Sequence, residues 1–268
     1  MINPLTELML TAARKAGAEI MQHYKNGVGI ERKGDGSPVT IADQNAEDII
    51  LEHLASTGIP VLGEESVAAG RIPELGNKFF VVDPLDGTKE FIKQNGEFTV
   101  NIALVENGVP IAGVVTAPAL NLEFVADEAG AFSVTKAADG ADIFLRLQTR
   151  SDGPRKVVAS RSHGHAALDT LCQELQIEED ISVGSSLKLC LVARGDALLY
   201  PRFTPTCEWD IAAGQAILLR AGGVVLKIDG TPLTYGKSDV DFFNPYFVAA
   251  ADLNIAHKAA QIMQRLVG

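Results

Sequence analysis

The segment that most constrains the fold is an unbroken apolar run at residues 79–82, followed at once by the polar sequence DPLDGT at 83–88. Branched and aromatic residues in such a run predict a strand that is buried on both faces. Two acids three residues apart, with Pro after the first and Gly after the second, predict a tight turn at the end of that strand. Both carboxylates and the carbonyl of Leu85 should then point outward from the strand end.

Apolar periodicity predicts the elements around this strand. Apolar side chains recur at helical spacing over 5–20 and again over 40–54, so each segment should form a helix. The glycine-rich, charged stretch 27–37 indicates a turn or hairpin between them. Extended runs are predicted at 60–62, 98–105, 111–116 and 122–126, with Glu106-Asn107-Gly108 as a hairpin turn.

The pattern changes after the polar stretch 136–154, where strands begin to alternate with helices. Strands are predicted at 157–160 and 197–200, and helices at 166–175, 186–194 and 211–221. Gly222-Gly223 should end the last of these helices, because glycine tolerates left-handed backbone angles. We therefore expect a layered α/β fold in two lobes: an N-terminal α+β lobe over 1–145 and a C-terminal α/β lobe over 146–268, with the site between them.

The formal net charge of −11 argues against a nucleic-acid polymer or an anionic membrane as partner, since both need basic patches. A small phosphorylated substrate stays compatible with this charge, because bound divalent cations reverse the field inside one pocket. The three widely spaced cysteines predict reduced thiols. No apolar stretch reaches the roughly 18 residues of a transmembrane segment, and no secretory signal is evident, so a cytoplasmic location is expected.

Acidic residues follow or begin three separate elements. Glu64 and Glu65 follow the extended run at 60–62, Asp83 and Asp86 follow the buried strand, and Asp210 begins the apolar helix. Two unit charges about 4 Å apart repel by on the order of 4 kcal/mol at an effective dielectric near 20. If the acids converge, divalent ions must occupy the cluster, and oxygen ligands suit magnesium. Taken singly, Glu64 and Glu65 are typical of a solvated pair, Asp210 of a helix cap, and the segment 83–88 of a surface turn.

Three segments, GEESVAAG, DPLDGT and WDIAAGQA, resemble the signature motifs of the inositol monophosphatase superfamily of metal-dependent, lithium-sensitive phosphatases. Further segments resemble its bacterial CysQ branch, the 3'(2'),5'-bisphosphate nucleotidases: LDGTKEFIKQNGEFTVNIAL, ASRSH, GSSLKLCLVARG and YPRFTPT. The resemblance runs from about Ala12 to Tyr246. It implies an inositol-monophosphatase-like αβαβα sandwich.

The resemblance also implies how magnesium is bound. Glu64, Asp83 and the Leu85 carbonyl would bind a first ion. Asp83, Asp86 and Asp210 would bind a second, so that Asp83 bridges the two. A third, weaker ion would lie near Glu64 and Asp43.

The same resemblance implies that Thr88, oriented by Asp43, holds and deprotonates the attacking water. Glu64 is the competing base and Glu65 a lesser one. Two metal ions about 4 Å apart lower the pKa of such a water and stabilise the leaving alkoxide, so no covalent intermediate is needed.

The implied substrate is adenosine 3',5'-bisphosphate, hydrolysed to AMP and phosphate. Backbone N–H groups of Gly87 and Thr88 would hold the phosphoryl group beside Asp210. The expected nucleotide contacts, including those to the second phosphate, are His163, Ser185, Ser186, Lys188 and Arg202. Glu208, beside the metal motif, has no assigned role.

Two other functions stay open at this point. The chain resembles inositol or sugar monophosphatases in the same metal motifs, and an inactive phosphate-binding scaffold would also retain the fold. A homodimer is compatible with the sequence, as is a peripheral position on the cytoplasmic face of the inner membrane. Without the resemblance, Lys188 is also typical of a solvated helix lysine, and His163 of an ordinary surface residue.

Overall fold

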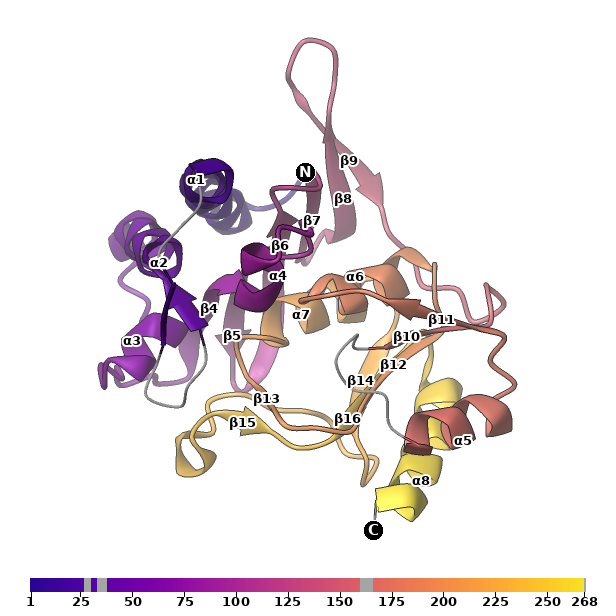
Figure 1. Ribbon diagram of the computed structural model, residues 1–268. Helices are drawn as coiled ribbons and strands as arrows, with labels where there is room; N and C mark the ends of the chain where they lie inside the picture. Colours follow the sequence, from indigo (N-terminus) through magenta and orange to yellow (C-terminus); the bar gives the residue numbers. More distant parts are fainter. Residues whose placement is uncertain (27–29, 33–37, 160–165, 268) are drawn as a thin grey trace.

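The computed structural model of the protein describes residues 1–26, 30–32, 38–159 and 166–267. These residues form five alternating layers of helices and sheets (Figure 1). The predicted layered α/β fold is confirmed. Buried apolar residues form three clusters: two lie between a sheet and its outer helices, and the third joins both sheets to the helices between them.

The first sheet has seven strands in sequence order: β3 (Val61–Gly63), β4 (Lys78–Asp86), β5 (Thr99–Glu106), β6 (Val109–Ala117), β7 (Leu122–Asp127), β8 (Gly130–Lys136) and β9 (Asp142–Arg146). Neighbouring strands of this sheet are antiparallel, except that β3 and β4 are parallel. Asn107 and Gly108 form the predicted turn between β5 and β6, both with positive φ. A short antiparallel pair joins β1 (Ile30–Arg32), which lies in the segment 27–37 predicted as a turn or hairpin, to β2 (Pro38–Thr40), which directly follows that segment.

Two helices cover the outer face of the first sheet, namely α1 (Pro4–Asn26) and α2 (Ile41–Leu54). The apolar stripe of α1, which includes Met9, Ala16 and Ile20, packs on alternate residues of β4, β5 and β6. Both helices confirm the sequence prediction. A 3-10 turn, η1 (Ala55–Thr57), ends α2 at Gly58.

The inner layer consists of α6 (Leu187–Arg194) and α7 (Ala212–Arg220), which lie between the two sheets. The second sheet has the order β11 (Glu179–Ser182), β10 (Lys156–Ala159), β12 (Leu199–Arg202), β16 (Phe247–Ala250) and β14 (Val224–Lys227). The outer helices α5 (Ala166–Glu174) and α8 (Leu253–Val267) cover its far face. Shorter elements are α3 (Glu64–Ala68), α4 (Thr88–Ile92), η2 (Ser238–Val240), β13 (Thr206–Cys207) and β15 (Phe243–Asn244).

Several elements were not predicted. The segment 136–154, interpreted as a polar connection, contains β9, so the first sheet reaches Arg146. The strand β9 is an edge strand with exposed Ile143 and Leu145 on one side, which weakens the apolar signal. The helix α8 and strands β14 and β16 were also missed, although α8 buries a helical stripe of small and apolar residues.

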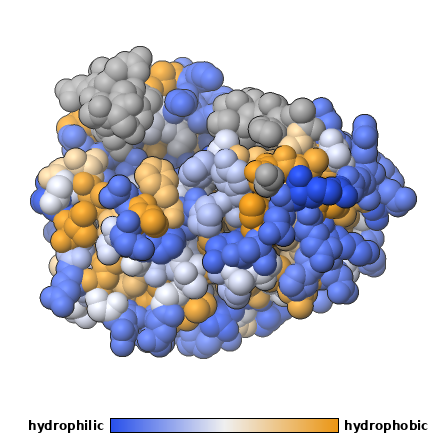
Figure 2. Space-filling view, turned by 90° about the horizontal axis from the view of Figure 1, so that it is seen from below, coloured by the Kyte–Doolittle hydropathy of each residue, from blue (hydrophilic) through white to orange (hydrophobic). Residues whose placement is uncertain are grey.

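The surface seen in Figure 2 mixes hydrophilic side chains with small groups of hydrophobic ones. Such mixing is ordinary for a globular protein, because polar side chains alone cannot cover the surface. Among the described residues, no helix is both long and apolar enough to cross a bilayer.

Candidate active site

The first feature of the site is an irregularity at the end of β4. The predicted tight turn after the strand is wrong in detail, because β4 continues to Asp86. Asp83 pairs with Asn101 and Asp86 with Thr99, so the register shifts between the two pairs. The Leu85 N–H donates to Asp83 Oδ1 at 3.0 Å within this bulge. A bulge changes the direction of side chains, and this one sends both aspartates toward the same side.

The acids at 83, 86 and 210 converge as predicted. Carboxylate oxygens of Asp83, Asp86 and Asp210 all lie within 4.8 Å of one another. Burial, followed by the charges of Asp86 and Glu64, raises the pKa of Asp210 to about 8. Glu64, at the first position of α3, is therefore close enough to act on Asp210 electrostatically. The sequence predicted a cation site if these acids converge, and the structure shows that they do.

A polar bridge connects the two halves of the cluster. The Asn101 amide donates to Ser186 Oγ at 2.8 Å, and the Ser186 hydroxyl donates to the Asp210 carbonyl at 2.6 Å. Ser186 Oγ also lies 3.0 Å from Asp86 Oδ2. Asn101 and Ser186 are both buried. The Ser186 hydroxyl is thus fixed between the Asp86 carboxylate and the Asp210 backbone carbonyl, a geometry that favours positioning these two residues over contacting a substrate.

A second polar chain reaches the site from the start of α2. Thr40 caps this helix, and both its N–H and its hydroxyl donate to Asp43 Oδ2, at 2.8 and 2.7 Å. The Thr88 hydroxyl lies 3.2 Å from Asp43 Oδ1 and 3.4 Å from the Leu85 carbonyl. Asp43 is 2% exposed, so its carboxylate orientation is set by these bonds. The predicted pair of Asp43 and Thr88 is therefore in hydrogen-bond contact.

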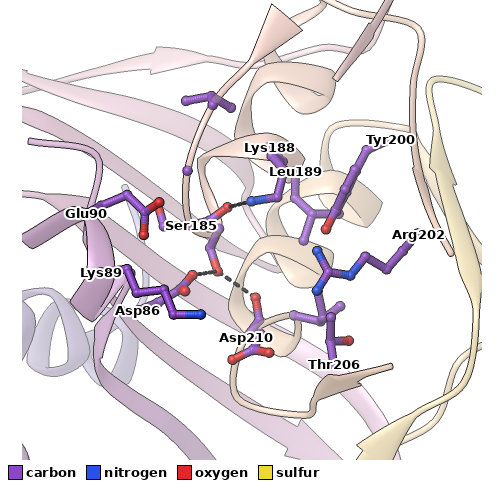
Figure 3. A pocket seen from close by; sticks show the side chains of 15 residues that line it. Asp86, Lys89, Glu90, Ser185, Lys188, Leu189, Tyr200, Arg202, Thr206 and Asp210 are labelled. Carbon is purple, nitrogen blue, oxygen red and sulfur yellow. Dashed lines mark hydrogen bonds between the residues drawn. The ribbon is translucent and has the colours of Figure 1, made fainter. Parts of the chain in front are cut away.

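A cavity of about 240 Å³ opens beside the acids, between the first sheet and the second half of the chain (Figure 3). Asp86, Gly87 and Asp210 line it together with Ser185, Ser186, Lys188 and Arg202. The structure thus brings seven of the predicted site residues to one cavity. Gly87 has a φ of +94° there, and a Cβ at this position would lie 3.1 Å from the Glu97 carbonyl, so glycine suits the turn into α4.

The wall from the second half of the chain carries two predicted cations. Lys188 is buried, donates to the Ser185 carbonyl and lies 5.6 Å from the centre of the Tyr200 ring. Burial lowers the pKa of Lys188, while the charge of Asp86 opposes this shift. Ser185 has a φ of +50°, a strained value for a residue with a side chain. Arg202 extends from β12 toward the cavity, and its Nε donates to the Thr204 carbonyl at 3.3 Å.

The cavity also has lining residues that the sequence prediction did not assign: Lys89, Glu90, Tyr200 and Thr206. Lys89 and Glu90 directly follow the DPLDGT motif, and Tyr200 and Thr206 belong to the YPRFTPT segment. Their positions next to or within these motifs could have indicated that they line the site. Asn101 was missed as well, although an amide in an otherwise apolar strand is itself unusual. His163 lies outside the described residues, and its predicted nucleotide contact stays a prediction.

Glu208, which had no assigned role, binds the backbone and side chain of a neighbouring segment. Its buried carboxylate accepts hydrogen bonds from the N–H groups of Gly236 and Lys237, at 2.7 and 2.9 Å, and from Lys237 Nζ at 2.6 Å. Lys237 also contacts Asn244, whose amide donates to the Cys207 carbonyl. Hydrogen bonds of Glu208 therefore connect the 234–244 segment to the turn that carries Asp210.

Comparison with known proteins identifies the family of the chain. Residues 1–264 match the inositol monophosphatase family. The chain belongs to the inositol monophosphatase family. Within it, the 3'(2'),5'-bisphosphate nucleotidase CysQ of Salmonella typhimurium is 46% identical over 247 residues, covering 91% of this chain and 98% of that protein. The protein of the same name from Escherichia coli strain K12 is 45% identical over 239 residues, covering 88% and 95%.

A solved structure gives the same result. CysQ from Bacteroides thetaiotaomicron, described as a bacterial member of the inositol monophosphatase family, superimposes with a TM-score of 0.76 at 38% identity. The match covers 92% of this chain and 97% of that chain. The resemblance found in the sequence is confirmed, and the chain is a homologue of CysQ proteins.

Members of this family use Mg²⁺. The donor set of this chain fits such an ion, since three carboxylates within 4.8 Å offer hard oxygen ligands. The raised pKa of Asp210 indicates that burial and repulsion from neighbouring carboxylates disfavour its ionised form. A bound divalent cation would offset this repulsion.

Proposed function

We propose that the protein is a magnesium-dependent 3'(2'),5'-bisphosphate nucleotidase that hydrolyses the 3'-phosphate of adenosine 3',5'-bisphosphate to AMP and phosphate. The observation that carries this proposal is the acid cluster of Asp83, Asp86 and Asp210, of which Asp86 and Asp210 line one cavity together with Lys188 and Arg202. The carboxylates can bind the metal ions that hold the scissile phosphate. The positively charged side chains on the other wall of the cavity can bind a second phosphate. Relatives that carry the nucleotidase name at 45–46% identity support the same substrate class.

For the metal site, we propose two magnesium ions with Asp83 as the bridging ligand. Glu64 and the Leu85 carbonyl would complete one position, and Asp86 and Asp210 the other. A third, weaker ion would lie near Glu64 and Asp43. When bound, magnesium would neutralise the carboxylates, lower the pKa of water and stabilise negative charge on the leaving oxygen.

Thr88, oriented by Asp43, is proposed to hold and deprotonate the attacking water. The Thr88 hydroxyl lies 3.2 Å from Asp43 Oδ1, so Thr88 can accept a hydrogen bond from water while it donates to Asp43. Thr40 holds the opposite oxygen of Asp43, which keeps Oδ1 facing Thr88. Glu64 is the competing base and Glu65 a lesser candidate. The Gly87 and Thr88 N–H groups would bind phosphoryl oxygens as charge redistributes.

On the substrate side, Arg202 and Lys188 are proposed to bind the second phosphate. The Arg202 guanidinium can make two parallel charge-assisted bonds to one phosphate, which a lysine cannot. Within the described part of the chain, the buried Ser185 hydroxyl has no hydrogen-bond partner, so a nucleotide hydroxyl or phosphate oxygen could supply one. Ser186 is proposed to act through Asp86 and Asp210, and His163 to contact the ribose or base.

The decisive experiment is phosphate release from adenosine 3',5'-bisphosphate and from inositol 1-phosphate, each with and without Mg²⁺. The proposal expects magnesium-dependent turnover that strongly favours the bisphosphate. A preference for inositol 1-phosphate would instead identify an inositol or sugar monophosphatase. Absence of magnesium-dependent hydrolysis of either substrate by folded protein would indicate a phosphate-binding scaffold. Addition of Li⁺ should inhibit the reaction at sub-millimolar to millimolar concentration if the metal site is that of the family.

A further inference from the structure

A buried glutamate on α2 binds the backbone beside the proposed metal ligand Glu64. Glu47 is 2% exposed, and its carboxylate faces the start of α3. Glu47 Oε2 accepts from the Glu65 N–H at 2.8 Å. Glu47 Oε1 accepts from the Ser66 N–H at 2.7 Å and from the Ser66 hydroxyl at 2.6 Å. One carboxylate therefore receives three hydrogen bonds from two successive residues of a helix that begins at Glu64.

This contact replaces the cap that the sequence of α3 does not provide. The N-cap residue of α3 is Gly63, which has no side chain to accept from the first N–H groups. A helix of five residues has little stability of its own, so an external acceptor decides its orientation. Glu47 supplies that acceptor from α2, and the negative charge is favourable at a helix N-terminus.

The glycine in the GEES motif has a physical reason in the same contact. A Cβ built on Gly63 would lie 2.7 Å from both the Cδ and the Oε2 atom of Glu47. Distances below about 3 Å cannot be tolerated without movement, and movement of this carboxylate would break its bonds to α3. Gly63 and Glu47 thus form one packed unit that sets how closely α2 approaches the start of α3.

One face of α2 therefore serves two parts of the site. Asp43 and Glu47 are four residues apart and lie on the same side of the helix. Asp43 contacts Thr88, whereas Glu47 contacts Glu65 and Ser66. Any rotation of the α3 backbone would move the side chain of Glu64 relative to Asp83 and Asp210.

We infer that Glu47 is a positioning residue: it orients α3 so that Glu64 can bind the divalent cation, and it touches neither the cation nor the substrate. This inference rests on the proposed role of Glu64 as a metal ligand. Outer residues that orient metal ligands commonly change metal affinity about 10–100-fold when replaced. Loss of the Glu47 carboxylate should therefore weaken metal binding while leaving the substrate contacts of Arg202 and Lys188 in place.

The test is a Mn²⁺ titration of the substrate-free protein, with bound metal measured by electron paramagnetic resonance. Glu47→Gln keeps the side-chain shape but replaces one acceptor oxygen by an NH₂ group. We expect Glu47→Gln to weaken Mn²⁺ binding about tenfold, and Ser66→Ala, which removes one bond, to weaken it less. Glu52→Gln, an exposed glutamate of the same helix, should leave Mn²⁺ affinity unchanged.

Glu64→Gln separates this inference from the proposed function. If Glu64→Gln weakens Mn²⁺ binding and Glu47→Gln does not, the positioning role is overturned and the metal site stands. If neither weakens it, both the positioning role and the assignment of Glu64 are wrong. Circular dichroism melts of every variant show that the titrated protein is folded.

A second variant approaches the same contact from the other side. Gly63→Ala should displace the Glu47 carboxylate and weaken Mn²⁺ binding to a similar degree as Glu47→Gln. Because both changes break the same bonds, the double variant should bind Mn²⁺ within about twofold of Glu47→Gln alone. Fully multiplicative losses would mean that the two residues act independently and would contradict the inference. In turnover assays, the half-saturating Mg²⁺ concentration should rise with little change in KM for the nucleotide.

Discussion

At the scale of single residues, the site depends on acids that are unfavourable without a counter-ion. Asp83 is 1% exposed and lies within 4.8 Å of Asp86 and Asp210. Such a carboxylate adds repulsion to the unliganded fold and becomes favourable only when a cation is shared among the three. The energetic role of Asp83 therefore differs between the metal-free and the metal-bound protein.

We expect Asp83→Asn to lower kcat by about 10³-fold or more, equivalent to about 4 kcal/mol of transition-state stabilisation. The metal-free variant should be at least as stable as the native protein, because one repelling charge is removed. Added Mg²⁺ should raise the melting temperature of the native protein but not that of the variant. Turnover assays and thermal melts with EDTA or Mg²⁺ measure both effects. A variant that keeps near-native kcat would exclude Asp83 as the bridging ligand.

Arg202 gives a prediction about specificity. Arg202→Ala should raise KM for adenosine 3',5'-bisphosphate about 10–100-fold, the loss expected for charge-assisted bonds. KM for 3'-AMP, which lacks the second phosphate, should change little. Arg194→Ala is the matched control, since this arginine of α6 pairs with Asp196 away from the cavity lining. Equal losses for the two substrates would contradict a role of Arg202 in binding the second phosphate.

At the scale of elements, the beginning of α2 couples helix stability to the site. The Thr40 hydroxyl accepts from the Ala42 N–H and donates to Asp43 Oδ2, so one side chain serves as helix cap and as carboxylate anchor. Beyond the opposite end of the helix, in η1, a second threonine forms hydrogen bonds only to the backbone. Thr57 Oγ1 donates to the Leu54 carbonyl and accepts from the Ile59 N–H.

Thr40→Ala should cost about 1 kcal/mol in the free energy of unfolding, the usual value for a lost N-cap. It should also lower kcat, because Asp43 Oδ2 loses one of the two Thr40 bonds that keep Oδ1 directed at Thr88. Thr57→Ala should lose a similar amount of stability with kcat unchanged. Urea unfolding and steady-state kinetics on both variants test this pair. A Thr40→Ala protein with native kcat would show that Asp43 does not need this anchor.

At the scale of the whole molecule, Arg14 connects the first helix to the far strands of the first sheet. Its guanidinium donates to both carboxylate oxygens of Glu123 on β7 and of Asp142 on β9. These side chains are about one quarter exposed, so the network is shielded better than an ordinary surface pair. The hydrogen bond from Arg14, and then that from Lys136, lowers the pKa of Asp142 to about 2.

We expect Arg14→Leu to lower the free energy of unfolding by about 1–2 kcal/mol near pH 7. Because the pKa of Asp142 is lowered in the folded state, its contribution is present above the usual carboxylate range and is lost as pH falls from about 4 to about 2. The difference between native protein and variant should shrink across that window. Urea unfolding at a series of pH values measures it. A difference that does not vary with pH would assign the loss to packing alone.

The exposed pair of Lys78 and Glu106 provides the control for this experiment. Both side chains are 42% exposed, and Nζ lies 3.0 Å from Oε1. Lys78→Leu should change the free energy of unfolding by no more than about 0.5 kcal/mol, since exposed ion pairs are screened by water. A loss as large as that of Arg14→Leu would mean that burial does not distinguish the two pairs.

The sequence by itself determined the strong local patterns. The helical stripes of α1 and α2, the buried run of β4 and the turn at Asn107-Gly108 follow from periodicity and turn chemistry among neighbouring residues. The family followed from three acidic motifs, and the convergence of Asp83, Asp86 and Asp210 was expected from their places at element ends. The edge strand β9 and the helix α8 were not predicted, because their local apolar patterns are weak.

Only the tertiary structure decided which distant side chains meet. The contact of Glu47 with Ser66, the bridge from Asn101 to Ser186 and the anchor of Glu208 on Lys237 join residues 19, 85 and 29 positions apart. Nothing in the neighbourhood of each residue encodes its partner, because the distance between them is set by how whole layers pack. Local sequence specifies elements and carries the chemistry, whereas packing selects which of these groups act together.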